Sequence, residues 1–337
     1  MATGDPHTSP LTLLDRRIVG ALQLDGRAPW RRIAAVLGES ERTVARRGAQ
    51  LLANGVVVVT GLSPLRAGAG NPWVLRLQCA PGTTQLAAGA LARRNDSNFT
   101  YITTGAYDLV TEVMCPDNRI GALTMEELPL IRGIVRSDSA PIVRVHRSVH
   151  NWEPHVLSPD ERTALTCDIP LIRIDNRAAK PSLTNVDRTI LRALAEDGRC
   201  NNEELARMCG VSEATARRRV ETLRADGLVY FRAVIEPALL GLPIEALLWL
   251  RVAPTRIDEV GQLLAEDSAV RYASEIASDA NFVVDVTAAD RGALRTLITT
   301  SRWAILSETV EVSFLIESLK RSTVLAARLR RTSPLED

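Results

Sequence analysis

The sequence predicts an α+β fold built as a tandem duplication, in which a winged helix-turn-helix domain is followed by a ferredoxin-like βαββαβ sandwich domain and the pair then occurs again. Two observations support this prediction. An offset of 172 residues aligns residues 15–59 with residues 187–231 without a gap, and 19 of the 45 aligned pairs are identical. Each aligned segment is then followed by alternating strand-like and helix-like patterns. Identity over this length indicates an internal duplication.

The first copy begins with the pattern of three helices and one strand. Apolar side chains at helical spacing define the helices, and Asp25-Gly26 and Gly38 mark the turns between them. A run of four valines predicts the strand. The segments are residues 11–24, 30–37 and 40–53 as helices and residues 56–60 as the strand. This order is typical of a winged helix-turn-helix domain, which we place at residues 11–62 and, in the second copy, at residues 183–236.

The third helix of each copy has the features of a helix that reads DNA. In the second copy Ser212 is a good N-cap, and Gly227 follows the end of the helix. The helical period turns Ala214, Thr215 and Arg218 away from the apolar face. Small, hydroxyl and guanidinium side chains near a helix N-terminus suit the major groove of double-stranded DNA. The alternative is a solvated arginine face on an ordinary amphipathic helix.

Positive charge is unevenly distributed between the two copies. The whole chain has a formal net charge of +1, whereas residues 11–60 carry +4 and residues 183–232 carry +1. Arg31 and Arg32 contribute to this difference, because the second copy has two glutamates at these positions. The pattern indicates that the first copy is better suited to neutralise phosphate groups.

After each helix-turn-helix the pattern changes to alternating strands and helices. In the first copy the strands are residues 73–79, 98–104, 109–115 and 142–149, and the helices are residues 84–93 and 118–128. In the second copy the strands lie near residues 247–252, 271–277, 282–288 and 309–316, and the helices near residues 256–266 and 290–300. The order predicts a four-stranded antiparallel sheet with two helices on one face, at residues 72–150 and 244–320. Residues 151–182 form a linker in which Ser158 begins a short helix.

The second face of each predicted sheet has no helix to cover it. An apolar sheet face needs a partner, so we expect a homo-oligomer that associates through the sheet faces. The two sandwich domains of one chain can cover each other, or sandwich domains of different chains can do so.

Composition and motifs argue against membrane proteins, metalloproteins and enzymes. No apolar run approaches the ~20 residues of a membrane span, and residues 1–10 lack the parts of a signal peptide, so we expect a cytoplasmic protein without membrane contact. The cysteines form no CxxC pair, and we expect reduced apolar side chains at Cys79, Cys115, Cys167, Cys200 and Cys209. We find no phosphate-binding loop, nucleophile elbow or metal cluster, and therefore expect no cofactor and no enzyme.

Three motifs give the chain a resemblance to a known family. They are D..I...L..DGR at residues 15–27, G.S..T..RR...L...G.V at residues 38–57 and TG.YDL at residues 104–109. In this order, with the helix-turn-helix motifs occurring twice, they resemble the Lrp/AsnC (feast/famine) transcriptional regulators as two fused copies over nearly the whole chain. The resemblance implies RAM-type sandwich domains, promoter DNA as a partner, and an amino acid or related small effector bound between sandwich domains.

The resemblance also implies which side chains meet the DNA. Bases would be faced by Arg42, Thr43 and Arg46 in the first copy and by Ala214, Thr215 and Arg218 in the second. Phosphates would be bound by Ser40, Arg47, Ser212, Arg217 and Arg219, with Arg31 and Arg32 adding charge in the first copy.

The effector site of the resembled family lies near the glycine-containing loop. Its positions in the first copy are Thr103, Thr104, Gly105, Tyr107 and Asp108. Glycine permits close backbone approach, and the Asp108 carboxylate can meet an ammonium group. The second copy has Ser278, Asp279 and Asn281 instead and lacks the glycine and the tyrosine, so the two pockets should differ. The alternative is a tight β-turn closed by Asp108.

Gly48 departs from the repeat, because the second copy has Val220 there. We expect a loss of core packing and of about 1 kcal/mol of helix propensity at this position. An effector-binding scaffold with decayed DNA-reading units is therefore one alternative function. A second alternative is a non-specific architectural DNA-binding protein, against which the near-neutral charge argues.

A third alternative is an enzyme similar to the siroheme decarboxylases, which also contain fused pairs of this fold and resemble Lrp/AsnC proteins. Such chemistry would need histidines in the sandwich cleft. The histidines of this chain are His7, His146, His150 and His155. His146 and His150 lie on the same side of the predicted strand and could flank a ligand, but we expect partly exposed histidines at the surface.

Overall fold

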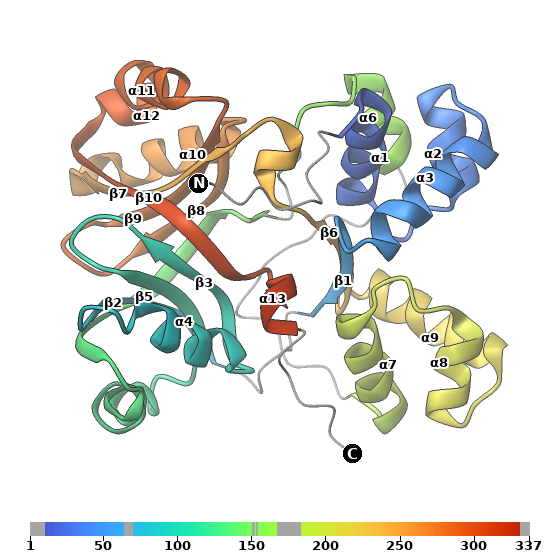
Figure 1. Ribbon diagram of the computed structural model, residues 1–337, viewed down its shortest axis with the longest axis horizontal. Coiled ribbons are helices and arrows are strands. Elements are labelled where there is room, and N and C mark those ends of the chain that lie inside the picture. Colours follow the sequence, from blue (N-terminus) through green and yellow to red (C-terminus); the bar gives the residue numbers. More distant parts are fainter. Residues whose placement is uncertain (1–10, 64–69, 150–151, 153, 167–182, 331–337) are drawn as a thin grey trace. The chain divides into compact units, whose positions relative to one another are not determined.

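The computed structural model describes residues 11–63, 70–149, 152, 154–166 and 183–330, and Figure 1 shows its elements. The chain forms two compact units, each made from two separate stretches of sequence. One unit contains both helix-turn-helix segments and the helix of the linker, and the other contains both sandwich segments. The predicted tandem α+β fold is confirmed. Part of the predicted linker, residues 167–182, lies outside the described residues.

Each helix-turn-helix segment consists of three helices followed by one strand. In the first copy these are α1 (Leu13–Leu24), α2 (Trp30–Leu37), α3 (Glu41–Ala53) and β1 (Val58–Leu62). In the second copy they are α7 (Asn185–Glu196), α8 (Asn202–Cys209), α9 (Glu213–Ala225) and β6 (Tyr230–Val234). Threonine capping boxes start α1 and α7, and a left-handed glycine follows α2 and α8. The repeated sequence therefore folds into the same local structure twice.

The strands assigned to the wings join the two copies to each other. β1 and β6 pair antiparallel, from Val58 opposite Val234 to Leu62 opposite Tyr230. In this unit the two-stranded ladder lies between the helices of the first copy and those of the second (Figure 1). The linker helix α6 (Pro159–Thr166) packs against α1 and α2.

Each copy contributes a four-stranded sheet with helices on its outer face to the sandwich unit, and the two sheets join, with β11, into one nine-stranded sheet. The first copy contributes β2 (Asn71–Cys79), α4 (Thr84–Arg93), β3 (Ser97–Thr103), β4 (Leu109–Cys115), α5 (Ile120–Ala122) and β5 (Ile134–Arg147). The second contributes β7 (Ile244–Val252), α10 (Ile257–Glu266), β8 (Val270–Ile276), β9 (Phe282–Ala288), α11 (Arg291–Thr300), α12 (Arg302–Ile305), β10 (Ser307–Arg321), β11 (Val324–Leu325) and α13 (Ala327–Arg330). Within this unit α4 lies on one outer side of the strands, and α10, α11 and α12 lie on the opposite side (Figure 1).

The last long strand of each copy takes part in both sheets. β5 pairs with β2 and then with β8, while β10 pairs with β7 and then with β3. The hydrogen bonding therefore continues from one copy into the other at both edges. Val74 and Val110 of the first copy and Leu247 and Val283 of the second belong to one buried cluster between the sheets. Within this unit, the bare sheet face of each copy is covered by the other copy.

The largest differences between the sequence prediction and the structure concern two of the predicted elements. The strand expected at residues 142–149 is β5, which begins at Ile134 and ends at Arg147. Its first half includes Arg136-Ser137-Asp138-Ser139, which lack the alternation of apolar and polar residues by which a strand is predicted from sequence. The helix expected at residues 118–128 is divided into α5, a π-helical turn and a 3-10 turn that contains Pro129. Proline lacks the N–H that a continuing α-helix requires.

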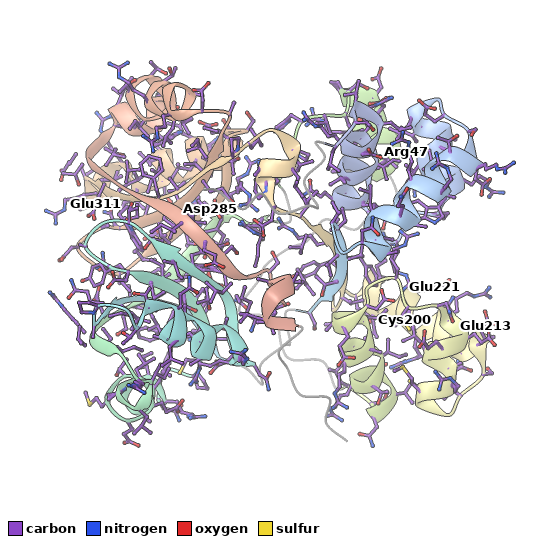
Figure 2. The ribbon with its side chains drawn as sticks, in the orientation of Figure 1. Arg47, Cys200, Glu213, Glu221, Asp285 and Glu311 are labelled. Atoms are coloured by element: carbon purple, nitrogen blue, oxygen red, sulfur yellow. The ribbon has the colours of Figure 1, made fainter. Side chains whose placement is uncertain are left out.

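Glu112 is a buried carboxyl group that links the two copies. It accepts hydrogen bonds from the hydroxyl of Tyr272 on β8 and from Nδ2 of Asn98 on β3, both at 2.6 Å. Burial raises the pKa of Glu112, and these two hydrogen bonds only partly offset the rise. The equivalent positions in the second copy hold Asp285 and Arg271, which form an ion pair at 3.5 Å. Asp285 lies among the strands in Figure 2. The two copies thus bring different charges to their shared interface.

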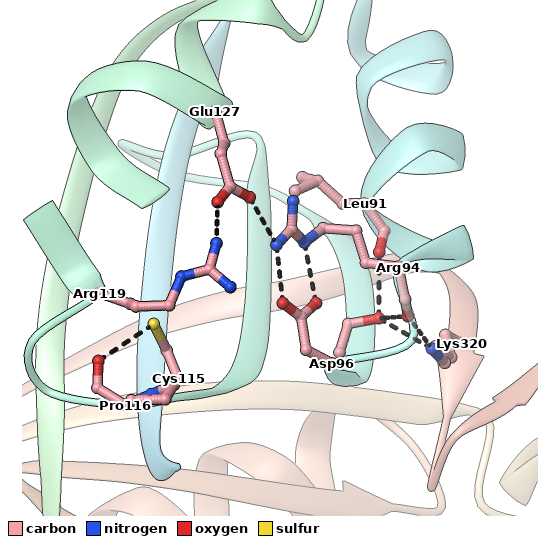
Figure 3. Close-up of polar contacts among 9 residues, drawn as sticks. Leu91, Arg94, Asp96, Cys115, Pro116, Arg119, Glu127 and Lys320 are labelled. Carbon is pink, nitrogen blue, oxygen red and sulfur yellow. Dashed lines mark hydrogen bonds and ion pairs between the residues drawn. The ribbon is translucent and has the colours of Figure 1, made fainter. Parts of the chain in front are cut away.

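The end of β10 is held to the first copy by a buried lysine. Nζ of Lys320 donates to the carbonyl of Arg94 at 2.7 Å and to Oγ of Ser97 at 2.9 Å. Figure 3 shows this contact beside the ion pairs that Arg94 forms with Asp96 and Glu127. The Lys320 side chain therefore exchanges its water shell for fixed acceptors in the segment between α4 and β3, which secures the position of β10.

Gly48 leaves no hole in the first helix-turn-helix core, so the expected loss of packing is wrong. A Cβ atom on Gly48 would lie 2.4 Å from ring atoms Cζ3 and Cη2 of Trp30. Trp30 occupies this space, whereas the second copy has Asn202 and Val220 at the two equivalent positions. The change at one position is compensated by the change at the other. The low helix propensity of glycine remains.

Gly48→Val is expected to lower the free energy of unfolding by about 1–3 kcal/mol, because the new side chain overlaps the Trp30 ring. Adding Trp30→Asn recreates the pair of the second copy, so the double variant should lose less than the two single variants together. Urea unfolding followed by circular dichroism measures these values. Ala49→Val, at an exposed position of α3, controls for the β-branched side chain. Strictly additive losses would contradict direct compensation.

Glu112 should make the stability of the protein decrease as the pH rises. Its pKa is raised in the folded state, so its contribution is complete below the ordinary value of 4.5 and is lost as the pH rises through the raised value. Urea unfolding from about pH 4 to about pH 8 should show this decrease, and Glu112→Gln should diminish it. Glu311→Gln, which changes an exposed carboxyl group on β10, should retain it. A Glu112→Gln profile identical to that of the unsubstituted chain would refute the assignment.

Candidate nucleic-acid interface

A glycine turn and a serine cap position each candidate DNA-reading helix. Gly38 has a φ of +69° and Gly210 a φ of +65°, a left-handed conformation that favours glycine. Oγ of Ser40 and Oγ of Ser212 each accept a hydrogen bond at 3.2 Å from the backbone N–H three residues later. The turn and the cap fix where α3 and α9 begin. The cap serines themselves are exposed.

The N-terminal halves of both helices present predicted site residues to solvent. Arg42 and Arg46 on α3 are exposed, as are Ala214, Arg217 and Arg218 on α9. The predicted threonines are half-buried, and each hydroxyl lies within 2.9 Å of the hydroxyl of the cap serine. α9 also carries exposed acids, and two of them, Glu213 and Glu221, are labelled in Figure 2. Glu41 of α3 is exposed at the position equivalent to Glu213, so the two candidate faces share a geometry and differ in the placement of their charged side chains.

Arg47 and Arg219 are directed toward the first helix of their own domain. Nη1 of Arg47 lies 2.8 Å from Oδ1 of Asp15, and Nε of Arg219 lies 2.8 Å from Oδ1 of Asp187. Burial raises the pKa of both carboxyl groups, but hydrogen bonds from the arginines and from the cap threonines outweigh it, so both pKa values are lowered. Arg47 is labelled in Figure 2. These ion pairs hold α3 against α1 and α9 against α7.

Arg31 and Arg32 have different surroundings. Arg31 is exposed. Nη2 of Arg32 donates to the carbonyls of Ala164 at 2.9 Å and Leu165 at 3.3 Å, in the last turn of α6. A cation at this position satisfies carbonyl groups that the end of a helix leaves without partners. Arg32 therefore connects α2 to α6.

The glycine loop of the first sandwich domain is a tight turn, and most of its polar side chains form hydrogen bonds within the turn or to neighbouring strands. Oδ2 of Asp108 accepts the backbone N–H of the last residue of β2 at 2.7 Å. The hydroxyl of Thr103 donates to the carbonyl of Tyr107 at 3.0 Å, and Thr104 pairs with β10 through its N–H and its hydroxyl. Gly105 has a φ of +106°. The Asp108 carboxylate thus closes the turn.

The corresponding loop of the second copy has different chemistry. The side-chain amide of Asn281 bonds the backbone of Val252 through both of its polar atoms, at 2.8 and 2.7 Å. Asp279 is exposed, and its backbone carbonyl accepts a hydrogen bond from Nε of Arg251 at 3.1 Å. Ser278 faces Arg76 of the first copy, with 3.3 Å between Oγ and Nη2. The two loops therefore approach each other at Arg76.

Arg76 on β2 is a candidate site residue that the sequence analysis did not select. Its guanidinium carbon lies 4.8 Å from the ring centroid of Tyr107 and 4.9 Å from that of Trp249. Its Nε donates to Oδ2 of Asp138 at 2.7 Å. Arg76 and Trp249 occupy equivalent positions of the two copies, and the cation–π contact between them depends on their difference. The signal in the sequence is a charged residue within an apolar strand pattern.

His146 is half-buried as a residue, as expected, but its imidazole side chain is almost completely covered. Its side chain is 5% exposed, and its ring centroid lies 5.5 Å from that of Phe282. His155 is exposed, and His7 and His150 lie outside the described residues. Across the parts of the chain that the structure describes, no group of three or more His, Cys, Asp or Glu side chains could hold a metal ion.

The described cysteines are free thiols. Burial raises the pKa of Cys79 and of Cys200 to about 11, so both remain protonated at neutral pH. Cys167 lies outside the described residues. None of the helices described has the length and the apolar composition to span a bilayer.

Comparison with known sequences identifies the two helix-turn-helix segments. The model of the AsnC-type helix-turn-helix domain matches residues 11–52 and 183–224. An uncharacterised HTH-type transcriptional regulator of Pyrococcus furiosus is 40% identical over 85 residues, which are 25% of this chain and 57% of that protein. The HTH-type transcriptional regulator FL11 of Pyrococcus abyssi is 28% identical over 106 residues, which are 31% of this chain and 70% of that protein. The chain thus spans little more than half the length of the first relative.

A solved structure is similar to this chain over almost the whole length. The crystal structure of the siroheme decarboxylase NirDL has a TM-score of 0.58 and 14% identity, and the match covers 92% of this chain and 93% of that one. At this identity the likeness shows a shared fold alone. The sequence matches, in contrast, coincide with α1 to α3 and with α7 to α9. The chain therefore carries the AsnC-type helix-turn-helix domain twice, once in each copy.

Proposed function

We propose that the chain is a sequence-specific DNA-binding transcriptional regulator that reads double-stranded DNA with the N-terminal halves of α3 and α9. The observation that carries this proposal is the exposed face of each capped helix, with Arg42 and Arg46 in one copy and Ala214 and Arg218 in the other. A guanidinium group can pair with guanine through two hydrogen bonds, and alanine lets the backbone approach the bases. The relatives' description as HTH-type transcriptional regulators supports this assignment.

Contacts to phosphate groups would surround these two faces. The exposed Arg31 and Arg217 and the capped N-termini of α3 and α9 are suited to them. Arg47 and Arg219 would act indirectly, because their ion pairs hold the reading helices in place. Association of several chains would multiply modest affinities through effective concentration.

The regulator would respond to an amino acid or related small effector bound at Arg76, between the loops of residues 103–108 and 278–281. Arg76 is already held between the Tyr107 and Trp249 rings, and it pairs with Asp138. A zwitterion could separate this pair, placing its carboxylate on Arg76 and its ammonium group on Asp138. Since Arg76 and Trp249 come from different copies, such binding would favour one arrangement of the copies over another.

The DNA-reading role predicts specific losses of affinity. Arg42→Ala/Arg46→Ala and Arg218→Ala should each bind a duplex selected from a random-sequence library about 10-fold or more weakly, because a bidentate base contact contributes roughly 1–3 kcal/mol. Gel-shift titration at fixed salt, with scrambled competitor, measures this loss. Arg295→Ala, at an exposed position of α11, is the matched control and should bind normally.

Two outcomes would count against this role. Equal affinity of the unsubstituted chain for selected and scrambled duplexes would favour the architectural alternative. Normal DNA binding by both arginine variants would show that the N-terminal halves of α3 and α9 do not read the DNA.

The effector role predicts that at least one common L-amino acid binds the unsubstituted chain in a calorimetric titration. Arg76→Met should abolish this binding, because it removes the group that pairs with the ligand carboxylate while keeping an apolar stem between the rings. Arg144→Met, at an arginine on β5 whose side chain is 61% exposed, should bind normally. Absence of binding by any amino acid would contradict the effector role and leave the DNA-reading role standing.

A further inference from the structure

The Asp-Gly-Arg motif that occurs in both copies forms a reciprocal contact between them. Nη1 of Arg27 donates to the carbonyls of Gly198 and Cys200, at 3.0 and 2.9 Å. Nη1 of Arg199 donates to the carbonyls of Gly26 and Ala28, at 2.7 and 3.3 Å. Each arginine therefore binds the backbone of the other copy's loop. We call residues 25–28 and 197–200 the clamp.

Each half of the clamp is ordered by its own aspartate. Oδ1 of Asp25 accepts the backbone N–H of Arg27 at 3.0 Å, and Oδ1 of Asp197 accepts that of Arg199 at 2.8 Å. This turn places the arginine before it reaches the partner loop. The guanidinium groups also stack on aromatic rings, with Arg27 5.2 Å from the centroid of Phe231 and Arg199 4.3 Å from that of Trp30.

The glycines let the clamp rest on the β1–β6 ladder. A Cβ atom on Gly26 or on Gly198 would lie 2.8 Å from Cγ1 of Val59, and the N–H of Gly198 donates to the carbonyl of Val59 at 2.8 Å. A ladder of two strands is marginally stable by itself in water. The clamp adds contacts on the same short ladder and between the same two copies.

The clamp also reaches a DNA-reading helix directly. Oδ2 of Asp25 in the first copy lies 3.0 Å from Nη2 of Arg224 in the last turn of α9. The Asp25 side chain is 4% exposed and that of Arg224 is 30% exposed, so water screens this pair only partly. The position equivalent to Arg224 in α3 is Leu52, which carries no charge. This ion pair therefore connects the first copy's loop to α9.

We propose that the clamp fixes the distance and orientation between α3 and α9, and thereby selects the spacing of the two DNA half-sites that one chain can bind together. The inference rests on the proposed DNA-reading function. Two reading helices on one rigid frame bind cooperatively only where the half-sites match their separation, whereas helices on a loose frame tolerate many separations. The clamp is thus a positioning device and touches no base.

A distance measurement tests the clamp without DNA. Spin labels carried by genetically encoded ketone amino acids at Glu41 and Glu213, the exposed first residues of α3 and α9, report the separation of the helices by electron–electron double resonance. The unsubstituted clamp should give one narrow distribution. Arg27→Gln/Arg199→Gln should broaden or shift it, and Arg192→Gln, at an exposed position of α7, should not.

A spacing series then tests the consequence for DNA. The probe is a duplex selected by the unsubstituted chain from a random library, with about 1 to 10 base pairs inserted between its halves. Insertion should weaken binding of the unsubstituted chain about 10-fold or more and that of the double variant less than about 3-fold, with equal affinity for an isolated half-site. If the double variant does not fold, Asp25→Asn provides the test, because it keeps the turn and removes the charge opposite Arg224. Insertion should then weaken its binding by between about 3-fold and about 10-fold.

The distance measurement and the spacing series together distinguish a failure of the clamp from a failure of the DNA-reading function. A narrow, unshifted distribution and full spacing discrimination in the clamp variants would overturn the clamp. If the unsubstituted chain selects no duplex, the DNA-reading function fails, while the distance measurement still decides whether the clamp fixes α3 relative to α9.

Discussion

Burial of the inner sheet face is the constraint on which the sandwich unit depends. A four-stranded sheet with helices on one side leaves an apolar face that water does not solvate well. Val74 and Val110 of the first copy are covered by Leu247 and Val283 of the second, and β5 and β10 extend the hydrogen bonding across the boundary. Because the partner belongs to the same chain, it is present at a high effective concentration at any dilution.

Covalent fusion has removed the need for the contact surfaces to be self-complementary. In a symmetric homodimer both subunits use the same surface, so each contact between two residues occurs twice, once on each side of the symmetry axis. Here Arg76 meets Trp249 at the equivalent position, and Glu112 with Asn98 corresponds to Asp285 with Arg271. The core pair Trp30 with Gly48 likewise corresponds to Asn202 with Val220. The two copies thus differ in matched pairs: Trp30 with Gly48 preserves the packing of its core, whereas the pairs of the sandwich unit give the two copies different charges.

Arginine serves different purposes according to where the backbone places it. Arg42, Arg46 and Arg218 extend into solvent, whereas Arg47 and Arg219 are paired with buried aspartates behind the same helices. Two further sets bind backbone carbonyls: Arg32 at the end of α6, and the clamp arginines of the Asp-Gly-Arg loops. The number of arginines in the sequence therefore sets only an upper limit on the number that can contact DNA, because some of them are engaged in ion pairs and hydrogen bonds within the fold.

The sequence by itself determined the duplication, the order of the elements, the caps and turns of both helix-turn-helix segments, and the exposed arginines of α3 and α9. These features follow from local period and local hydrogen bonding, which Gly38, Ser40, Gly210 and Ser212 specify without distant contacts. The tertiary structure decided what lies far apart in the sequence: the engagement of Arg47 and Arg32, the compensation of Gly48 by Trp30, the burial of the His146 imidazole and the position of Arg76 between two rings. The start of β5 was also hidden, because the polar side chains of its first half carry no apolar alternation. A side chain's neighbours depend on how the two copies pack, and no period within one copy encodes that contact.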